Sequence, residues 1–218
     1  MLTAKNNKLM NKLLKYLLIV AVIGLLGYKS VYFEKLSTRK TEASQKFDAI
    51  AFSKKLWEEK MPAKIDSAVD LSVLIKEVTT DKEAAFKKYS NAMGIGNYRY
   101  ALIKTQATVI SVNEDEIQLQ LPLADSVITA VLATEYIYGN AVRDASALID
   151  IKDFPNTDNL NSVSEEMNKM VRTTVLPSFK TAVKKGDKIN ITAAVELNRE
   201  HIKWNGLELL PVRLQIIN

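Results

Sequence analysis

The hydrophobic pattern divides the chain into an apolar leader, a helical segment and a strand-rich segment. Residues 16–28 form an unbroken apolar run, YLLIVAVIGLLGY. Apolar residues then recur at helical spacing, which predicts three helices over 47–62, from about 67 to 78, and over 81–89. The first of these is expected to begin at Asp48, a capping residue, and to end at Pro62.

Beyond Gly94 and Gly96 the period of the apolar residues changes from helical to alternating, which predicts strands. In the first strand, 100–112, the apolar phase switches near Val109. This switch predicts a bulge or bend, as in a strand that serves two sides of a small barrel.

The remaining elements follow from alternation, turn residues and caps. A helix is expected to begin at Ser162 or Ser164 and to run to about Leu176. Pro211 is expected at an edge or a bulge of the last strand. The other predicted strands cover 117–121, 127–138, 185–197 and 207–217.

The resulting order of the strand-rich segment, β-β-β-α-β-β, is that of a five-stranded, OB-like Greek-key barrel. The same order also fits an open antiparallel sheet of the α+β class. We predict an α+β protein with an N-terminal membrane helix, a helical neck of about three helices and a small antiparallel β-barrel. The expected domains are 1–36, tail and anchor; 37–98, neck; and 99–218, barrel with one inserted helix.

The leader has the layout of an export signal, because four lysines precede the apolar run. The run is short for a full crossing, which takes about 20 residues, but flanking lysines and tyrosines suit a membrane interface. No small-residue cleavage pattern follows it, so an uncleaved anchor in membrane lipid is favoured over a removed signal or a buried core helix. The predicted anchor consists of Tyr16, Leu17, Leu18, Ile19, Val20, Ala21, Val22, Ile23, Gly24, Leu25, Leu26, Gly27 and Tyr28.

The leading lysines predict a single-pass protein of the cytoplasmic (inner) membrane, with its body on the periplasmic or extracytoplasmic side. Together with Lys29 they account for the net charge of +5: residues 1–29 hold five lysines and no acid, which leaves 25 basic and 25 acidic residues in the rest. The body is therefore formally neutral. Its composition predicts no nucleic-acid partner.

Candidate chemistry is sparse. The absence of cysteine excludes disulfides, thiol nucleophiles and cysteine-ligated metals, and the single histidine, His201, has no catalytic partner motif. We therefore expect no catalytic residues, no metal, no cofactor and no enzymatic activity.

Arg143 and Asp144 form the one candidate site. With Asn140 they could line a polar pocket for a carboxylate, a phosphate or a sugar hydroxyl. The alternative interpretation is an internal ion pair or cap that fixes the corner after the third strand, since adjacent Arg and Asp commonly play that part.

The same corner carries a resemblance to a known family. Residues 139–156, GNAVRDASALIDIKDFPN, contain a Gly-x-Ala-x-Arg-Asp motif, and residues 46–63, KFDAIAFSKKLWEEKMPA, precede it. Together these segments resemble a bacterial family of unknown function, the predicted periplasmic lipoproteins. The chain departs from the lipoprotein pattern because it has no cysteine to carry the lipid.

The resemblance implies a place in the cell envelope. Members of the family are often encoded near sugar-type ABC transporters, which implies an accessory role and a partner among ABC transporter components or other envelope proteins. The family has no known catalytic residues to transfer. We therefore predict a membrane-anchored, extracytoplasmic accessory or binding protein. The alternative is a small-molecule-sensing or hydrolytic domain that uses the Arg143–Asp144 corner.

Overall fold

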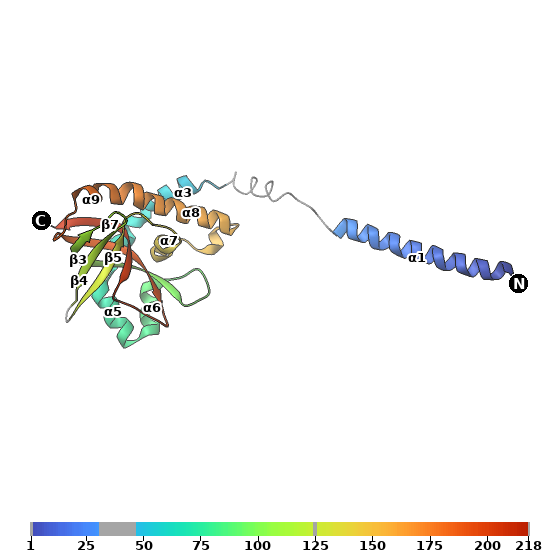
Figure 1. Cartoon of the computed structure of the whole chain (residues 1–218), viewed down its shortest axis with the longest axis horizontal. Helices are drawn as coiled ribbons and strands as arrows, with labels where there is room; N and C mark the ends of the chain where they lie inside the picture. The colour runs from blue at the N-terminus through green and yellow to red at the C-terminus, as the bar shows by residue number, and fades with distance from the viewer. Residues whose placement is uncertain (1, 31–46, 124–125, 218) are drawn as a thin grey trace. The chain divides into compact units, whose positions relative to one another are not determined.

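The computed structural model describes residues 2–30, 47–123 and 126–217 (Figure 1). The chain forms two units, 1–46 and 47–218, of which the first contains helix α1 (Leu2–Ser30). The described side chains of α1, from Leu13 to Leu26, are exposed on every face of the helix. Among the described residues, no helix combines the length and the hydropathy that a membrane span requires. The predicted boundary at residue 36 lies outside the described residues.

The second unit begins with a helical stretch in three parts: α3 (Ala49–Lys55), a π-helical turn η1 (Leu56–Lys60) and α4 (Met61–Asp66). As predicted, Asp48 caps α3, its side chain accepting a 2.9 Å hydrogen bond from the backbone of Ala51. The predicted end at Pro62 is wrong. Pro62 lies in the first turn of α4, after the π-turn, where the ring and the missing N–H are tolerated.

Two short helices follow, each capped by an aspartate, and a short strand lies before the first helix and after the second. Asp70 caps α5 (Leu71–Thr80), and Asp81 caps α6 (Lys82–Tyr89). Strand β1 (Val69–Asp70) pairs in parallel with β3, and β2 (Ser90–Asn91) pairs with it antiparallel. Because α5 and α6 are tied to β3 at both ends, their apolar faces are held against the barrel.

Five of the described strands form a closed barrel in the order β3-β4-β5-β7-β6, with β6 pairing back to β3. Strand β3 pairs with β6 along residues 98–108 and with β4 from Thr108 onward, with a register shift between Val109 and Ser111. The predicted bend near Val109 is confirmed, and the barrel is closed rather than an open sheet. The strands are β3 (Tyr98–Val112), β4 (Glu116–Pro122), β5 (Val127–Ala133), β6 (Lys188–Asn198) and β7 (Leu207–Ile217).

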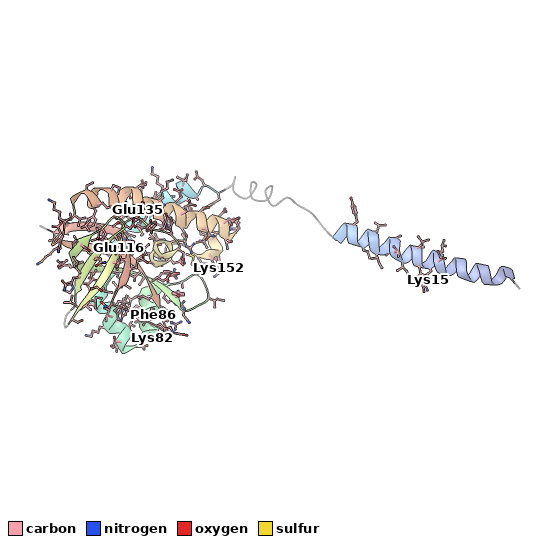
Figure 2. All side chains as sticks on the ribbon, in the orientation of Figure 1. Lys15, Lys82, Phe86, Glu116, Glu135 and Lys152 are labelled. Carbon is pink, nitrogen blue, oxygen red and sulfur yellow. The ribbon has the colours of Figure 1, made fainter. Side chains whose placement is uncertain are left out.

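The barrel has one core inside its wall and another outside it, because alternate residues of a strand face opposite sides. Ile103 faces the inner core, which also includes Leu74 of α5. Phe86 of α6, labelled in Figure 2, belongs to the same core. Leu102 faces the outer core, which the barrel shares with Met61 of α4 and with the later helices. The helices of the segment predicted as a neck therefore share their cores with the barrel.

The segment between β5 and β6 covers the outer wall of the barrel, and Figure 1 shows α8 and α9 along one side of it. The predicted start of this long helix at Ser162 or Ser164 is wrong. Asn156 caps α8, accepting a 2.8 Å bond from the backbone of Asn159. The helix also continues past Leu176, because a π-turn again precedes a proline, Pro177. The elements are α7 (Ala141–Ser146), η2 (Ile151–Asp153), α8 (Thr157–Met170), η3 (Val171–Val175) and α9 (Leu176–Ala182).

Two smaller predictions concern the strands. Strand β5 ends at Ala133, five residues before the predicted end at Tyr138. Pro211 lies where the register between β6 and β7 shifts, so its prediction at a bulge is confirmed. A proline is tolerated there because the ladder is already interrupted.

Candidate functional site

The candidate site is built on the corner that follows β5, residues 139–147. Gly139 has a φ of 76° and Ala147 a φ of 49°, so a left-handed residue lies on each side of α7. All six residues of α7 are buried, Arg143 and Asp144 among them. The helix packs against β3, β6 and α8, which fixes its position between the barrel wall and the covering helix.

Arg143 and Asp144 form an internal ion pair, as one of the two interpretations of the sequence proposed. Arg143 Nε donates to Asp144 Oδ1 at 2.7 Å, and the two side chains are only 5% and 1% exposed. Asn140 Nδ2 donates to the second carboxylate oxygen, Oδ2, at 2.6 Å. Both oxygens of Asp144 therefore have a partner, which a buried carboxylate requires.

The same guanidinium joins the corner to α8. Arg143 Nη1 donates to Ser164 Oγ at 2.8 Å and to the Leu160 carbonyl oxygen at 3.4 Å. Arg143 Nη2 makes no hydrogen bond to any described residue, and Arg143 lines a cavity. Arg143 Nη2 can therefore donate a charge-assisted hydrogen bond to a molecule in the cavity, while Nε and Nη1 are occupied.

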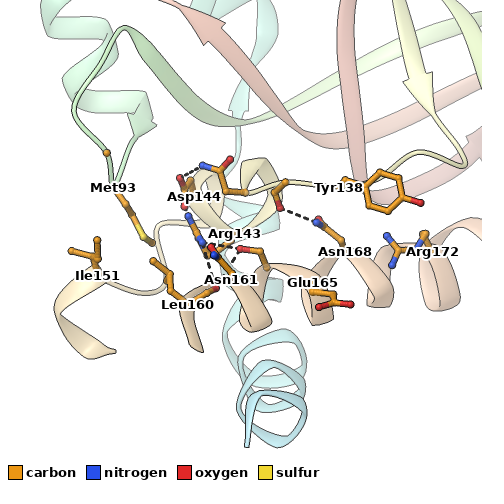
Figure 3. A pocket seen from close by; sticks show the side chains of 14 residues that line it. Met93, Tyr138, Arg143, Asp144, Ile151, Leu160, Asn161, Glu165, Asn168 and Arg172 are labelled. Carbon is orange, nitrogen blue, oxygen red and sulfur yellow. Dashed lines mark hydrogen bonds and ion pairs between the residues drawn. The ribbon is translucent and has the colours of Figure 1, made fainter. Parts of the chain in front are cut away.

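The cavity has a volume of about 600 Å³ and lies between the corner, α8, η3 and the turn after β2 (Figure 3). Small-molecule sites typically measure about 300–1,000 Å³. In Figure 3, Met93, Ile151 and Leu160 form one end of the cavity, and Tyr138 and Arg172 form the other. The cavity therefore has an apolar end and a cationic, aromatic end. The three candidate residues of the sequence, Asn140, Arg143 and Asp144, all line it.

A polar stripe on α8 and η3 forms one wall of the cavity and was missed by the sequence reasoning. Asn161, Glu165, Asn168 and Arg172 line the cavity at spacings of four, three and four residues, which places them on one helical face. This periodicity was readable in the sequence. The adjacent apolar stripe, which includes Met167, predicted only the face of the helix that is buried in the core.

Asn168 is buried and holds the corner. It is 3% exposed, and its Nδ2 donates to the Gly139 carbonyl oxygen at 2.8 Å. That bond fixes the orientation of the amide, because only a nitrogen can face a carbonyl oxygen. Within the described part of the chain, Asn168 Oδ1 has no hydrogen-bond partner.

The cationic end of the cavity is formed by Arg172. Its Nη1 donates to the carbonyl oxygen of Ile137, and the guanidinium lies 5.4 Å from the centre of the Tyr138 ring. The Tyr136 ring lies beside that of Tyr138 with centroids 6.5 Å apart, and both rings are exposed. No described carboxylate forms an ion pair with Arg172, so its charge is not neutralised by a neighbour.

Tyr100 supports the corner from the barrel. Its hydroxyl donates to Asn140 Oδ1 at 3.4 Å. Burial raises the pKa of Tyr100 above its usual value of 10.0, so at neutral pH the phenol is protonated and able to donate. The amide of Asn140 is thereby oriented toward Asp144.

The other features singled out in the sequence lie apart from this site. His201 is exposed in the loop between β6 and β7. Gly94 lines the cavity, and Gly96 has a φ of 151° in the same turn after β2. Over the described ranges, no group of three or more histidine, aspartate or glutamate side chains is placed to hold a metal ion.

Comparison with solved structures shows the fold. An OB-fold protein from Thermotoga maritima, solved at 1.90 Å resolution, is 23% identical, with a TM-score of 0.68 over 78% of this chain and 99% of its own. An OBody bound to hen egg-white lysozyme is 9% identical, with a TM-score of 0.27 over 55% of this chain and 81% of its own. The first likeness agrees with the closed barrel and identifies it as an OB fold. A search of curated proteins gave no match.

Comparison with protein families gives a match over residues 21–215, to the family described as predicted periplasmic lipoprotein. The match covers the barrel, the corner and the polar stripe of α8. The family name includes a lipid anchor, yet none of the 218 residues is a cysteine that could carry one. With nearly the whole chain matched, the protein belongs to the predicted periplasmic lipoprotein family, DUF2291.

Proposed function

We propose that this protein is a membrane-anchored binding protein of the cell envelope that takes up a small molecule in the cavity beside Arg143 and catalyses no reaction. One observation carries the binding role. Arg143 is held by Asp144 and Ser164 through Nε and Nη1, while its Nη2 remains available at a cavity of about 600 Å³.

The fixed geometry of Arg143 favours binding over a purely structural role. An arginine loses much rotamer freedom when it is ordered by a ligand. Here that ordering is already provided by the ion pair and by α8. A ligand oxygen at Nη2 therefore gains a charge-assisted hydrogen bond without that entropic cost.

The hydrolytic alternative has less support, because the polar groups nearest to Arg143 are occupied. Both oxygens of Asp144 accept hydrogen bonds, from Arg143 and from Asn140. Ser164 Oγ accepts from Arg143 and donates to the Leu160 carbonyl oxygen at 3.4 Å. Neither side chain is placed as a nucleophile with a free base beside it, which a hydrolytic site requires.

A thermal-shift screen of small metabolites on the full chain in mild detergent tests the binding role. A ligand at about 100 times its Kd should stabilise the fold by about 2.7 kcal/mol. Arg143→Lys should abolish the shift, because a lysine cannot hold Asp144 and Ser164 while also donating to the cavity. Arg213→Lys, on an exposed ion pair, is the matched control. A ligand that protects both variants like the wild type refutes binding at Arg143.

For location, we propose that α1 anchors the protein in the cytoplasmic (inner) membrane as a single pass, with the body in the periplasm. The family description supports an extracytoplasmic body. The exposed apolar side chains around α1 support the anchor, since a helix apolar on all faces needs lipid or protein around it. A periplasm-active reporter fused after residue 218 should be active. A reporter active only in the cytosol contradicts the proposal.

A partner among ABC transporter components, or another envelope protein, is proposed on the resemblance to the family alone. Extraction in mild detergent followed by affinity purification should recover such subunits together with the protein. The control is a variant whose leader lysines are replaced, so that it does not reach the membrane. Subunits that this variant also recovers have bound the protein only after lysis. Repeated recovery of the protein alone from membranes contradicts the partnership.

A further inference from the structure

Glu165 and Arg172 are two cavity charges of opposite sign. Both line the cavity, and neither forms an ion pair with another residue in the described ranges. They lie seven residues apart on one face of α8 and η3. At about 1.5 Å of rise per residue, their positions are separated by about 10 Å along the helix axis.

The buried ion pair of Arg143 and Asp144 adds no net charge to the cavity. Arg143 and Asp144 neutralise each other at 2.7 Å, so Glu165 and Arg172 set the charge that a ligand meets. A dianion would face Glu165, and an uncharged ligand would leave both charges without partners. A molecule with one anionic and one cationic end is complementary to this arrangement.

We propose that the cavity binds a short peptide with free termini, its carboxylate at Arg172 and its ammonium group at Glu165. This proposal rests on the proposed binding function and names its ligand class. An extended chain rises about 3.4 Å per residue, so about 10 Å corresponds to three residues. Arg172 is oriented in advance by the Ile137 carbonyl and the Tyr138 ring, which leaves its remaining donors for the carboxylate.

Between the two charges lies Asn168, which lines the cavity and whose Oδ1 has no hydrogen-bond partner among the described residues. On the other side of Glu165, Arg143 Nη2 is a donor for a peptide carbonyl of the first residue, and the amide of Asn161 both donates and accepts. Beyond Glu165, the apolar end at Met93, Ile151 and Leu160 suits an apolar side chain on the first residue (Figure 3). An acyl chain of equal length would leave these hydrogen-bonding groups without partners.

Calorimetry with four matched probes on the full chain in mild detergent tests the proposal. The probes are leucyl-alanyl-alanine with free termini, its N-acetyl form, its C-terminal amide and the doubly capped form. We expect each cap to weaken binding to the wild type at least about tenfold, since a charge-assisted hydrogen bond is lost at that end. Octanoate and a hexitol are the comparison ligands for an acyl chain and for a polyol.

Two variants connect each charge to one end of the peptide. Arg172→Gln should weaken the free-carboxylate peptide at least about tenfold and leave the C-terminal amide unchanged. Glu165→Gln should weaken the peptide with a free amine at least about tenfold and leave the binding of the N-acetyl form unchanged. Glu166→Gln is the matched control, because Glu166 is one residue away and pairs with Lys169. It should bind all four probes like the wild type.

Three outcomes overturn the proposal: no binding of the free peptide at millimolar concentration, equal binding of all four probes, or tighter binding of octanoate or the hexitol. A variant that weakens every probe equally overturns the assigned contacts. If a different metabolite is found whose binding Arg143→Lys abolishes, the binding function stands and only the peptide assignment fails. If no ligand binds, both fail.

Discussion

Replacing Asp144 by asparagine tests whether the buried ion pair organises the corner. The substitution keeps the size of the side chain and removes its charge. It leaves Arg143 charged and 5% exposed without a counter-ion, and it turns one carboxylate oxygen into an NH₂ group facing the Asn140 amide. Breaking a buried pair in this way typically costs about 3–5 kcal/mol. For a body of this size, that corresponds to about 6–20 °C in Tm.

The assay is urea unfolding of the full chain in detergent, followed by circular dichroism, with Asp66→Asn as the control. Asp66 also pairs with an arginine, Arg213, at 2.6 Å, but the two side chains are 67% and 50% exposed. The control should therefore lose at most about 1 kcal/mol. The chemical change is identical in the two variants, so the difference between them measures burial.

A double variant separates the ion pair from the packing around it. Arg143→Met together with Asp144→Asn removes both charges, and should recover part of the stability that Asp144→Asn alone loses. If Asp144→Asn costs no more than Asp66→Asn, the corner is not organised by this pair. In that case Arg143 is not held in advance as a donor for the cavity.

Three further predictions concern the surroundings of the site. Ala147→Gly should stabilise the protein by about 0.5–1 kcal/mol in chemical denaturation, because φ is 49° there, whereas Ala63→Gly within α4 should destabilise it by about 1 kcal/mol. Phe154→Ala should cost about 3–5 kcal/mol in the same assay, since its ring packs edge-on against Phe47 and Phe52 at 5.5 and 5.6 Å. Because burial raises the pKa of Tyr100, the unfolded chain loses this proton first, and stability should fall as the pH rises above about 10. In Tyr100→Phe, the free energy of unfolding should fall less over this pH range. A fall equal to that of the wild type contradicts the assignment of this pH dependence to Tyr100.

Local patterns in the sequence were sufficient for the order of the strands along the chain, which fits both a barrel and an open sheet; the pairing of β3 with β6 closes the barrel. The bend near Val109 was visible as a phase change of apolar residues, and the cap at Asp48 was visible from residue type. Alternation and capping depend on neighbours within a few residues along the chain. Such features can therefore be read without knowing what packs on them.

The helix limits depended on more than local pattern. Pro62 was expected to end a helix, yet it lies within a helical stretch after a π-turn, as Pro177 does in the later helix. Ser164 was considered as a cap, yet it is a buried helical residue bonded to Arg143. The prolines are tolerated because each lies in the first turn after a π-turn, whereas for Ser164 the contact with Arg143 outweighs a capping preference of about 1 kcal/mol.

The sequence alone determined the order of the strands along the chain, the apolar leader and the neutral body, and it singled out the Arg143–Asp144 corner as either a polar pocket or an internal ion pair. The tertiary structure decided that this corner lines a cavity, that Asn168 and Arg172 reach it from a helix, and that one donor of Arg143 is left open. The physical reason is distance along the chain. The cavity is formed by segments that are distant in the chain, from Met93 to Arg172, and their charges are paired or unpaired only once packing has brought them together.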